Sequence, residues 1–547
     1  MKVSFVAGVF AALASFATGS KYVWPSEYDE IEEILSLQGG YLSRRFADGV
    51  VPCSEGGNVK GRQNAAEWIR TAFHDMITHN SKKKTGGVDG SIWFELNRAE
   101  NGGLAFNNTF NFFNFLYSSR ASAADLLAMS VIVSHSSCGG STKIPFRHGR
   151  IDAGEAGPAG VPETHTPLKT MLSRFATAGY SHADMITMVA CGHTLGGVHS
   201  VNFPEISKGS TNIYNDTVTT FDGSPYQFDN SIATEYVKGT TKNPLIIGTN
   251  DTVNSDKRIF GSDKNKTMKA LAKKPSVFEA KCAKIFSRMI DTVPKGVKLS
   301  SPLEAIDIKP NITKLYLNDE GSLVFAGRVR VRTTEGAKKG RDQADLSVHL
   351  TYANRKGKGA TAIQTEYAGN STGLYGETFA WYEYETVIEP SAGISKFNIH
   401  LTVPSKKKTT KYTNQGHGYP VDDAILYQDV ESCVSRTSVN GTRAFVARVA
   451  LDKDRTSSAL RMEIVRFEKR QGVIVRKMDL ESIDFAATGE ESGIWAFYEA
   501  TVQLSTSAWS TTFDIVSDGK KKTKGSAGYD KTKMEFLRTR TCARVSS

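Results

Sequence analysis

The hydrophobic pattern of this chain changes once, near residue 300. Before that point apolar residues recur at helical spacing, for example in "AADLLAMSVIVSHSS" and "VFEAKCAKIFSRMIDTV". After about residue 310 they alternate with polar residues, as in "LVFAGRVRVRT" and "KFNIHLTV", with turn residues between the segments. We therefore expect a mostly α-helical domain followed by a β-rich half.

The β-rich half repeats itself. "FAGRV" at 325 returns as "FVARV" at 445, "LSVHLTYANRKG" at 346 as "LRMEIVRFEKRQG" at 460, and "FNIHLTVPSKKK" at 397 as "FDIVSDGKKK" at 513. Each repeat would cover about 110 to 120 residues, the usual size of a β-sandwich. The expected fold class is multi-domain α plus β, with two β-sandwich-like repeats. The expected ranges are 20–298 for the helical domain, 299–310 for a linker, and 311–432 and 433–547 for the repeats.

The first residues, "MKVSFVAGVFAALASFATG", have the pattern of a secretory signal peptide over residues 1–19, with Lys2, an apolar run and the small residues Ala17 and Gly19. We expect a secreted protein, extracellular or in a cell wall. Six cysteines, an even number, favour disulfides in such a protein. No later apolar run is long enough to span a membrane. Glycosylation sequons begin at Asn107, Asn215, Asn250, Asn265, Asn311, Asn370 and Asn440.

The formal net charge is +11, and part of it lies in the lysine runs 82–84, 406–408 and 520–522. Such runs fit either a surface for an anionic polymer or solvated loops. The sequence has no nucleic-acid-binding motif, and secretion argues against that partner, so we expect no nucleic acid.

One helical segment, "WIRTAFHDM" at 68–76, places a cation and a base on the same face. Arg70 and His74 are four residues apart, and Phe73 joins them. A second histidine, His193, comes late in a segment that opens with a capping box. Taken alone, His193 could be either a histidine packed in the core or a metal ligand. Together with Arg70, Phe73, His74 and a later aspartate it suits haem, with an imidazole as the iron ligand.

These motifs resemble those of the plant-type haem peroxidase superfamily, which contains cytochrome c peroxidase and the secreted fungal peroxidases. Half of the chain, from about 21 to 295, carries the resemblance, and its features are closest to the secreted fungal enzymes. "IRTAFHD" is similar to the distal segment, which implies that Arg70, Phe73 and His74 lie over the haem. "NGGL" is similar to the segment whose asparagine, here Asn101, orients the distal histidine.

The proximal side of the resemblance rests on two further segments. "VACGHTLGG" implies that His193 is the iron ligand of haem b, and "VNSDKRIFGSD" implies that Asp256 is its hydrogen-bond partner. Phe221 falls where the family has an aromatic residue beside the haem. A phenylalanine there argues against a protein radical at this position and against cytochrome c as reductant.

The resemblance also implies two calcium ions, one behind each haem-bearing helix. Clustered carboxylate, hydroxyl and carbonyl oxygens are calcium ligands, although the same residues are common in turns that cap helices. The distal set is Asp75, Gly87 through its carbonyl, Asp89 and Ser91. The proximal set is Thr194, Asp222, Ser224, Gln227 through its carbonyl and Asp229.

The activity implied is that of a haem-dependent peroxidase (EC 1.11.1.-). It would reduce hydrogen peroxide through a ferryl intermediate and oxidise small phenolic or dye-like donors one electron at a time. The positions that match the manganese ligands of manganese peroxidase are Gln63, Glu67 and His199, so one acid remains of three. Met188 stands where related enzymes expose a tryptophan. A small aromatic reductant is therefore the expected donor.

The resemblance also implies a disulfide between Cys53 and Cys138. The other four cysteines allow three pairings. Bridges within each half would join Cys191 to Cys282 and Cys433 to Cys542, and Cys191 fits a buried thiol equally well.

The β-rich half has aromatic residues on both faces of two expected strands, "FAWYEYETV" and "IWAFYEATV". One face should fill a core. The other fits either stacking on the sugar rings of a cell-wall polysaccharide or the contacts of a spacer or dimerisation module. The alternative function is thus a non-catalytic or weakly catalytic carbohydrate-binding protein on a peroxidase scaffold.

Overall fold

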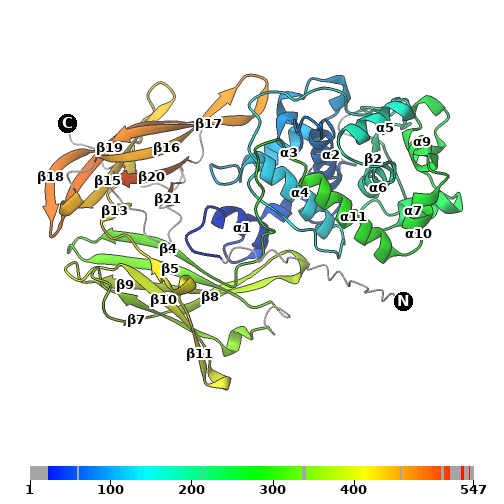
Figure 1. Ribbon diagram of the computed structural model, residues 1–547. Coiled ribbons are helices and arrows are strands. Elements are labelled where there is room, and N and C mark those ends of the chain that lie inside the picture. The colour runs from blue at the N-terminus through cyan, green and yellow to red at the C-terminus, as the bar shows by residue number, and fades with distance from the viewer. Residues whose placement is uncertain are drawn as a thin grey trace, which may run out of the picture.

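The computed structural model describes residues 22–57, 61–212, 215–334, 340–455, 459–506, 511–517, 531–534 and 541–542. The expected signal peptide, residues 1–19, lies outside these ranges. Helices occupy one side of the molecule and β-strands the other (Figure 1). The predicted fold class, a helical domain followed by two β-sandwich-like repeats, is confirmed.

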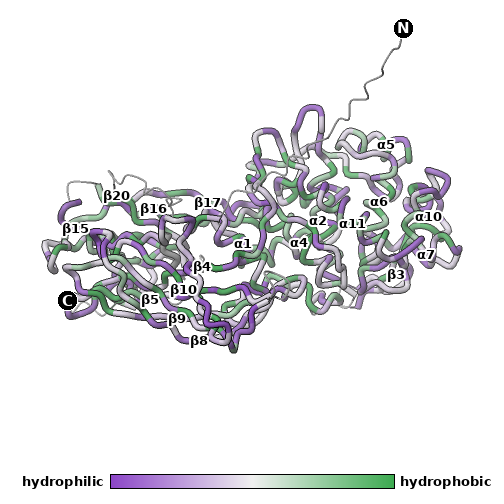
Figure 2. Tube along the Cα trace, turned by 60° about the horizontal axis from the view of Figure 1, so that its bottom comes forward, coloured by the Kyte–Doolittle hydropathy of each residue, from purple (hydrophilic) through white to green (hydrophobic). Residues whose placement is uncertain are grey.

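The helical part comprises residues 22–290. Its helix α4 is buried along most of its length, and Figure 2 shows hydrophobic segments around α4 and α6 with hydrophilic loops outside. The predicted capping box opens α6: the Ser181 N–H donates to Asp184, and the Ser181 hydroxyl accepts from the Asp184 N–H. The helices are α1 Asp29–Ser36, α2 Asn64–Ile77, α3 Ala105–Phe113, α4 Ala123–Ser137, α5 Leu168–Thr177, α6 His182–Gly192, α7 Ser231–Lys238, α8 Pro244–Ile247, α9 Ser255–Gly261, α10 Lys266–Ala272 and α11 Pro275–Ile290. A small hairpin joins β2 Gly197–His199 to β3 Val218–Thr220.

The first sandwich has two antiparallel sheets. One has the strand order β1-β8-β9-β5-β4, and the other has the order β11-β10-β6-β7 with β12 paired to β10. The strands are β1 Gly39–Gly40, β4 Ile308–Leu317, β5 Leu323–Arg332, β6 Ser347–Ala353, β7 Thr361–Gln364, β8 Glu366–Thr372, β9 Thr378–Ile388, β10 Lys396–Val403, β11 Lys408–Tyr412 and β12 Tyr419–Pro420.

The second sandwich follows the same plan. Its sheets have the orders β13-β15-β19-β18, with β14 paired to β15, and β17-β16-β20-β21. The strands are β13 Ile425–Tyr427, β14 Cys433–Val434, β15 Thr442–Asp452, β16 Leu460–Arg470, β17 Val473–Asp484, β18 Ala486–Ser492, β19 Trp495–Ser505, β20 Thr511–Ser517 and β21 Lys531–Met534. The motifs "FAGRV" and "FVARV" lie in the equivalent strands β5 and β15, so the sequence repeat is a structural repeat.

The domain boundaries expected from the sequence stay predictions. Helix α11 ends at Ile290, and β4 begins at Ile308. Two short strands pair across the expected limits. β1 precedes the helices that form most of the helical part, yet it pairs with β8. β13 lies before residue 433, yet it pairs with β15.

Both aromatic strand faces that sequence analysis left open are covered by the preceding part of the chain. Phe379 and Trp381, on the outer side of β9, are 0% and 3% exposed and pack with Leu37 and Tyr41 of the helical part. In β19, Trp495 and Phe497 are buried in the same hydrophobic cluster as the core of the first sandwich. These four aromatic side chains therefore serve domain docking, and they offer no surface for sugar rings.

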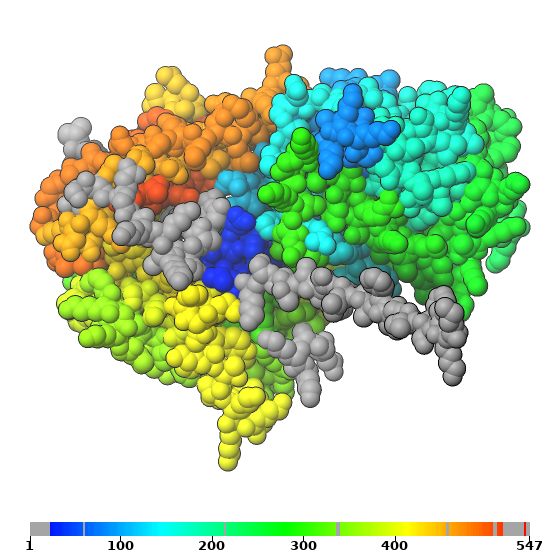
Figure 3. All heavy atoms as spheres, in the orientation of Figure 1, coloured from blue at the N-terminus to red at the C-terminus, as the bar shows by residue number. Residues whose placement is uncertain are grey.

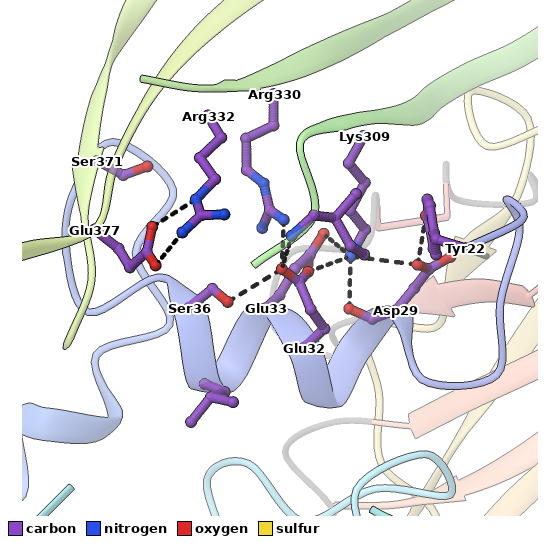
Figure 4. Close-up of polar contacts among 12 residues, drawn as sticks. Tyr22, Asp29, Glu32, Glu33, Ser36, Lys309, Arg330, Arg332, Ser371 and Glu377 are labelled. Carbon is purple, nitrogen blue, oxygen red and sulfur yellow. Dashed lines mark hydrogen bonds and ion pairs between the residues drawn. The ribbon is translucent and has the colours of Figure 1, made fainter. Parts of the chain in front are cut away.

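An ionic junction ties α1 to the first sandwich (Figure 4). The fully buried Glu32 accepts hydrogen bonds from Arg330 Nη2 at 2.6 Å and from Lys309 Nζ at 3.1 Å. Lys309 also meets Glu33 at 3.0 Å and Asp29 at 3.5 Å. Burial alone would raise the pKa of Glu32, but the two cations lower it to about 2. The junction therefore keeps its charges ionised inside the protein. The segment that contains α1 lies between the sandwiches and the other helices (Figure 3).

The second sandwich also contacts the helical part, through the β16–β17 hairpin. The Arg470 guanidinium lies 4.8 Å from the ring centre of Phe94 and 5.9 Å from that of Trp93. Phe467 contacts Tyr117 with ring centroids 6.4 Å apart. The helical part and the two sandwiches thus form a closed arrangement in which each contacts the other two.

Three disulfides join Cys53 to Cys138, Cys191 to Cys282, and Cys433 to Cys542. The pairing within each half is confirmed, and Cys191 is not a free thiol. None of the helices that the structure describes is both long and apolar enough to cross a membrane.

The ionic junction predicts a large loss of stability when one cation is removed. Arg330→Met leaves Glu32 buried without its closest partner, so we expect the free energy of unfolding to fall by about 3–5 kcal/mol. Urea unfolding measures this. The control Lys314→Met breaks a solvent-exposed pair with Glu385 and should cost about 1 kcal/mol or less. Equal, small losses in both variants would contradict the junction's importance.

The junction also predicts a pH dependence. Because folding lowers the pKa of Glu32 from 4.5 to about 2, its stabilising contribution is complete above the higher value and is lost as the pH falls toward the lower one. The difference in melting temperature between the native chain and Glu32→Gln should therefore narrow between about pH 5 and pH 2. A difference that does not change over this range would show that Glu32 is not held ionised by folding.

Candidate functional site

Two helices form facing walls of one cavity of about 320 Å³ in the helical part. Helix α2 lines it with Arg70, Phe73 and His74, which share one face as their spacing predicts. His193, directly after the end of α6, lines it from another element. Residues far apart in the sequence, chosen from separate motifs, therefore meet in one space.

His74 is held by an amide. Its Nδ1 lies 2.9 Å from Oδ1 of the buried Asn101, whose Nδ2 donates to the backbone oxygen of Glu95 at 3.0 Å. Since Oδ1 can only accept, Nδ1 carries the proton and Nε2 keeps its lone pair. Burial, together with the charge of Arg70, lowers the pKa of His74 to about 3. The ring is therefore a neutral base at neutral pH.

Arg70 supplies a fixed positive charge beside this base. Its Nη2 donates to the carbonyl of Gly102 at 2.9 Å, and its guanidinium lies 4.8 Å from the ring centre of Phe106. Burial lowers the pKa of Arg70 to about 10, so the group stays cationic at neutral pH. The half-buried Phe73 lies next to His74, with ring centroids 6.0 Å apart.

His193 is oriented by a carboxylate. Its Nδ1 lies 2.9 Å from Oδ2 of the fully buried Asp256, and Phe221 stacks on its ring at 4.4 Å with an angle of 10° between the planes. Asn243 Nδ2 donates to the same Oδ2 at 2.8 Å, and the Ser255 hydroxyl donates to Oδ1 at 3.3 Å. Because Nδ1 is bonded to Asp256, Nε2 is the nitrogen left to bind a metal.

Comparison with known proteins agrees with this geometry. A family model described as Peroxidase matches residues 57–274. L-ascorbate peroxidase 5, peroxisomal, of Arabidopsis thaliana is 31% identical over 222 residues, which are 39% of this chain and 75% of that protein. The chain belongs to the peroxidase family. Another relative, a WSC domain-containing protein of Arthroderma benhamiae, is 38% identical over 412 residues, which are 73% of this chain and 55% of that protein. Versatile peroxidase VPS1 of Pleurotus eryngii is 28% identical over 199 residues, 35% of this chain and 50% of that protein.

Membership of the peroxidase family implies haem, and the cavity suits it. Apolar side chains such as Met188, Leu195 and Phe175 line the space along with His74 and His193. A Cβ atom added to Gly192, next to His193, would meet no atom within 4 Å, so the wall is open there. An apolar slot with an imidazole on either side is the environment that a haem needs.

The residues expected to bind calcium near α2 are held by hydrogen bonds. Asp75 is buried, and its carboxylate accepts from the N–H groups of Asp89, Gly90 and Ile92 at 2.8 to 3.0 Å. The Ser91 hydroxyl lies 3.4 Å from the same carboxylate. Burial, followed by the charge of Asp89, raises the pKa of Asp75. These contacts suit a helix-capping turn, and calcium at this position stays a prediction.

The residues expected to bind calcium behind α6 also lie together. The Thr194 hydroxyl donates to the carbonyl of Asp229 at 2.7 Å, and the Ser224 hydroxyl donates to the Asp229 carboxylate at 3.1 Å. Burial, followed by the charges of Asp229 and Glu235, raises the pKa of Asp222 to about 7. Within the described residues no group of three or more His, Cys, Asp or Glu side chains is placed to hold a metal ion.

Sequence analysis missed two polar residues of the site. Asn243 contacts Asp256, as described above, and Asp216 lines the cavity while bonding His199 Nδ1 at 2.7 Å. Neither residue stands in a recognisable motif. Asp216 is brought to His199 by the β2–β3 hairpin, whose pairing of three residues is too short to be read from periodicity.

Proposed function

We propose that this protein is a secreted haem peroxidase (EC 1.11.1.-) that reduces hydrogen peroxide and oxidises small phenolic or dye-like donors one electron at a time. The observation that carries the proposal is the pair of oriented histidines in one cavity, His74 held by Asn101 and His193 held by Asp256. Haem b, bound through His193, would hold the two oxidising equivalents that hydrogen peroxide supplies.

The residues on the α2 side would move one proton and stabilise one charge. Nε2 of His74 accepts a proton from peroxide and returns it to the departing oxygen, which a neutral imidazole can do. Asn101 keeps the other ring nitrogen protonated, so the lone pair stays on the cavity side. Arg70 stabilises the negative charge that develops on the departing oxygen in a site with little water.

On the α6 side, the chain would hold and tune the metal ligand. Asp256 accepts the Nδ1 proton of His193, which fixes the ring and makes Nε2 more basic. The hydrogen bonds from Asn243 and Ser255 hold the Asp256 carboxylate in place. Stacking on Phe221 restricts rotation of the His193 ring.

The contacts at the cavity favour an organic donor over manganese. Gln63, Glu67 and His199 all line the cavity. However, both oxygens of Glu67 accept hydrogen bonds from Arg62, at 3.0 and 2.9 Å, and Asp216 bonds His199. Glu67, the one carboxylate among these three residues, is thus already neutralised by Arg62. Because a relative is named for ascorbate, ascorbate should be tested beside phenols and Mn²⁺.

Secretion is supported by the signal-peptide pattern and by three disulfides, which persist in oxidising compartments. The alternative function, a weakly catalytic carbohydrate-binding protein on a peroxidase scaffold, is less favoured. The catalytic residues expected from the family are present with their partners, and the aromatic faces that suggested sugar stacking are buried.

The histidine roles predict two distinct defects. In the haem-loaded protein, stoichiometric hydrogen peroxide should change the Soret band at once, and a phenol should restore it. His74→Ala should keep haem but slow this change by about 10²-fold or more, because its general base is lost. His193→Ala should lose haem or alter its coordination in the visible spectrum.

His182→Ala is the matched control, because His182 is an exposed histidine at the start of α6. It should behave like the native protein. A Soret band that is indifferent to peroxide in the native protein, or unchanged peroxide kinetics in His74→Ala, would contradict the proposed mechanism.

The proposal includes two calcium ions, supported by the clustered oxygen ligands near α2 and behind α6. Ca²⁺ that binds the folded state should raise the melting temperature, and a chelator should lower it. Asp222→Asn should remove much of this effect, since it takes a charge from the buried cluster. The control Asp251→Asn alters an exposed carboxylate of the same part and should keep the full response. Equal responses in the two variants would remove Asp222 from the calcium ligands.

A further inference from the structure

The two sheets of the first sandwich differ in their acidic residues. Strands β6, β7, β10 and β11 contain no aspartate or glutamate, and we call this sheet the basic sheet. The opposite sheet carries acids along β8 and β9, namely Glu366, Glu383 and Glu385. The opposite sheet also carries cations, but they are paired with acids, as Arg328 is with Glu383 and Lys314 with Glu385, whereas the strands of the basic sheet offer their lysines no acid partner.

The outer side of the basic sheet is polar and open. Along β10, Phe397, Ile399 and Leu401 are buried, so Asn398 and His400 between them face outward. The same alternation on β6 turns His349 and Thr351 outward. These outward side chains are half-buried at most, and the positions include no large apolar residue.

One row of side chains crosses all four strands. Gln364 on β7 is opposite His349 on β6, which is opposite His400 on β10, which is opposite Lys411 on β11. Neighbouring strands are about 4.8 Å apart, so the row spans about 15 Å. The row is thus a continuous line of polar side chains across the sheet.

The two histidines of the row stack on each other, with ring centroids 4.6 Å apart and an angle of 8° between the planes. His400 also bonds the Thr351 hydroxyl at 3.0 Å. The charged or titratable neighbours of His400 are His349 and Lys411, and after burial these two groups lower its pKa. On the other side His349 meets the uncharged Gln364. If this histidine pair gains a proton, no carboxylate on the strands of the basic sheet compensates the added positive charge.

Lysines extend the positive surface beyond the row. Lys396 begins β10 on the outward side, and Lys406 and Lys407 occupy the tip of the β10–β11 hairpin, with Lys407 in a left-handed turn. Figure 1 shows this hairpin projecting from the lower end of the sandwich. Lys406, Lys407 and Lys411 are exposed and Lys396 is half-buried, so their long side chains can reach a ligand that lies along the sheet.

We propose that the basic sheet binds an anionic polysaccharide, such as a polyuronate, whose carboxylates meet Lys396, Lys411 and the histidine pair. The threonine, asparagine and glutamine side chains between the charges suit sugar hydroxyl groups. The face has no protruding apolar side chain to enter a lipid bilayer. This binding uses neither the haem cavity nor the buried aromatic faces, so it is independent of the proposed peroxidase activity.

The experiment measures binding of the full-length protein to polygalacturonate, with a neutral β-glucan as the control polymer. Lys396→Glu with Lys411→Glu should weaken binding by about tenfold or more, because charge contacts to a polyanion dominate its affinity. The control pair is Lys82→Glu with Lys83→Glu, two exposed lysines of the helical part. It changes the net charge by the same amount and should alter binding by less than about twofold, because these lysines lie outside the site.

The histidine pair adds a second readout. Binding should tighten as the pH falls from about 7 to 5, because imidazoles gain a proton in this range. His349→Gln with His400→Gln should remove this pH dependence while leaving the unfolding temperature and the peroxide reaction unchanged. Equal losses in the two lysine pairs, equal binding of the neutral β-glucan, or tighter binding of double-stranded DNA or anionic lipid vesicles would each overturn the proposal.

Discussion

The contact between the helical part and the first sandwich depends on burying Glu32 between two cations. Taking an isolated carboxylate out of water costs several kcal/mol, and the cost is offset only when oppositely charged groups and hydrogen bonds surround it. Arg330, Lys309 and the backbone N–H of Ile306 do this for Glu32. Because each partner follows the helical part in sequence, the junction forms only when that part and the first sandwich have come together.

The two sandwiches dock on the rest of the chain through equivalent surfaces. Each has aromatic side chains on the outer side of one central strand, Phe379 and Trp381 in β9 and Trp495 and Phe497 in β19. Each buries them against the part of the chain that comes before it. An arginine–glutamate pair is also repeated at equivalent positions. Arg328 of β5 pairs with Glu383 of β9, and Arg448 of β15 pairs with Glu499 of β19. Duplication of a sandwich therefore duplicated its docking face.

Much of this could be predicted from the sequence, because local patterns carry it. The change of hydrophobic period, the repeat, the capping box at Ser181 and the paired histidines are all visible in short segments. The sequence did not show what the aromatic faces of β9 and β19 pack against, because alternation shows that a strand has two faces but not what covers each one. Asp216 and Asn243 were missed for the same reason. Their partners His199 and Asp256 are brought to them by tertiary folding, without a local pattern.

The sequence separation within the ionic junction has a consequence for biosynthesis. Glu32 and Arg330 are 298 residues apart. At about 5–20 residues per second, a ribosome needs roughly 15–60 s to go from one to the other. During that interval the acids of α1 exist without their cations, although Ile31 and Ile34 of the same helix belong to the hydrophobic core of the helical part. The first helix to be made thus completes its charge contacts only after the whole helical part has been synthesised.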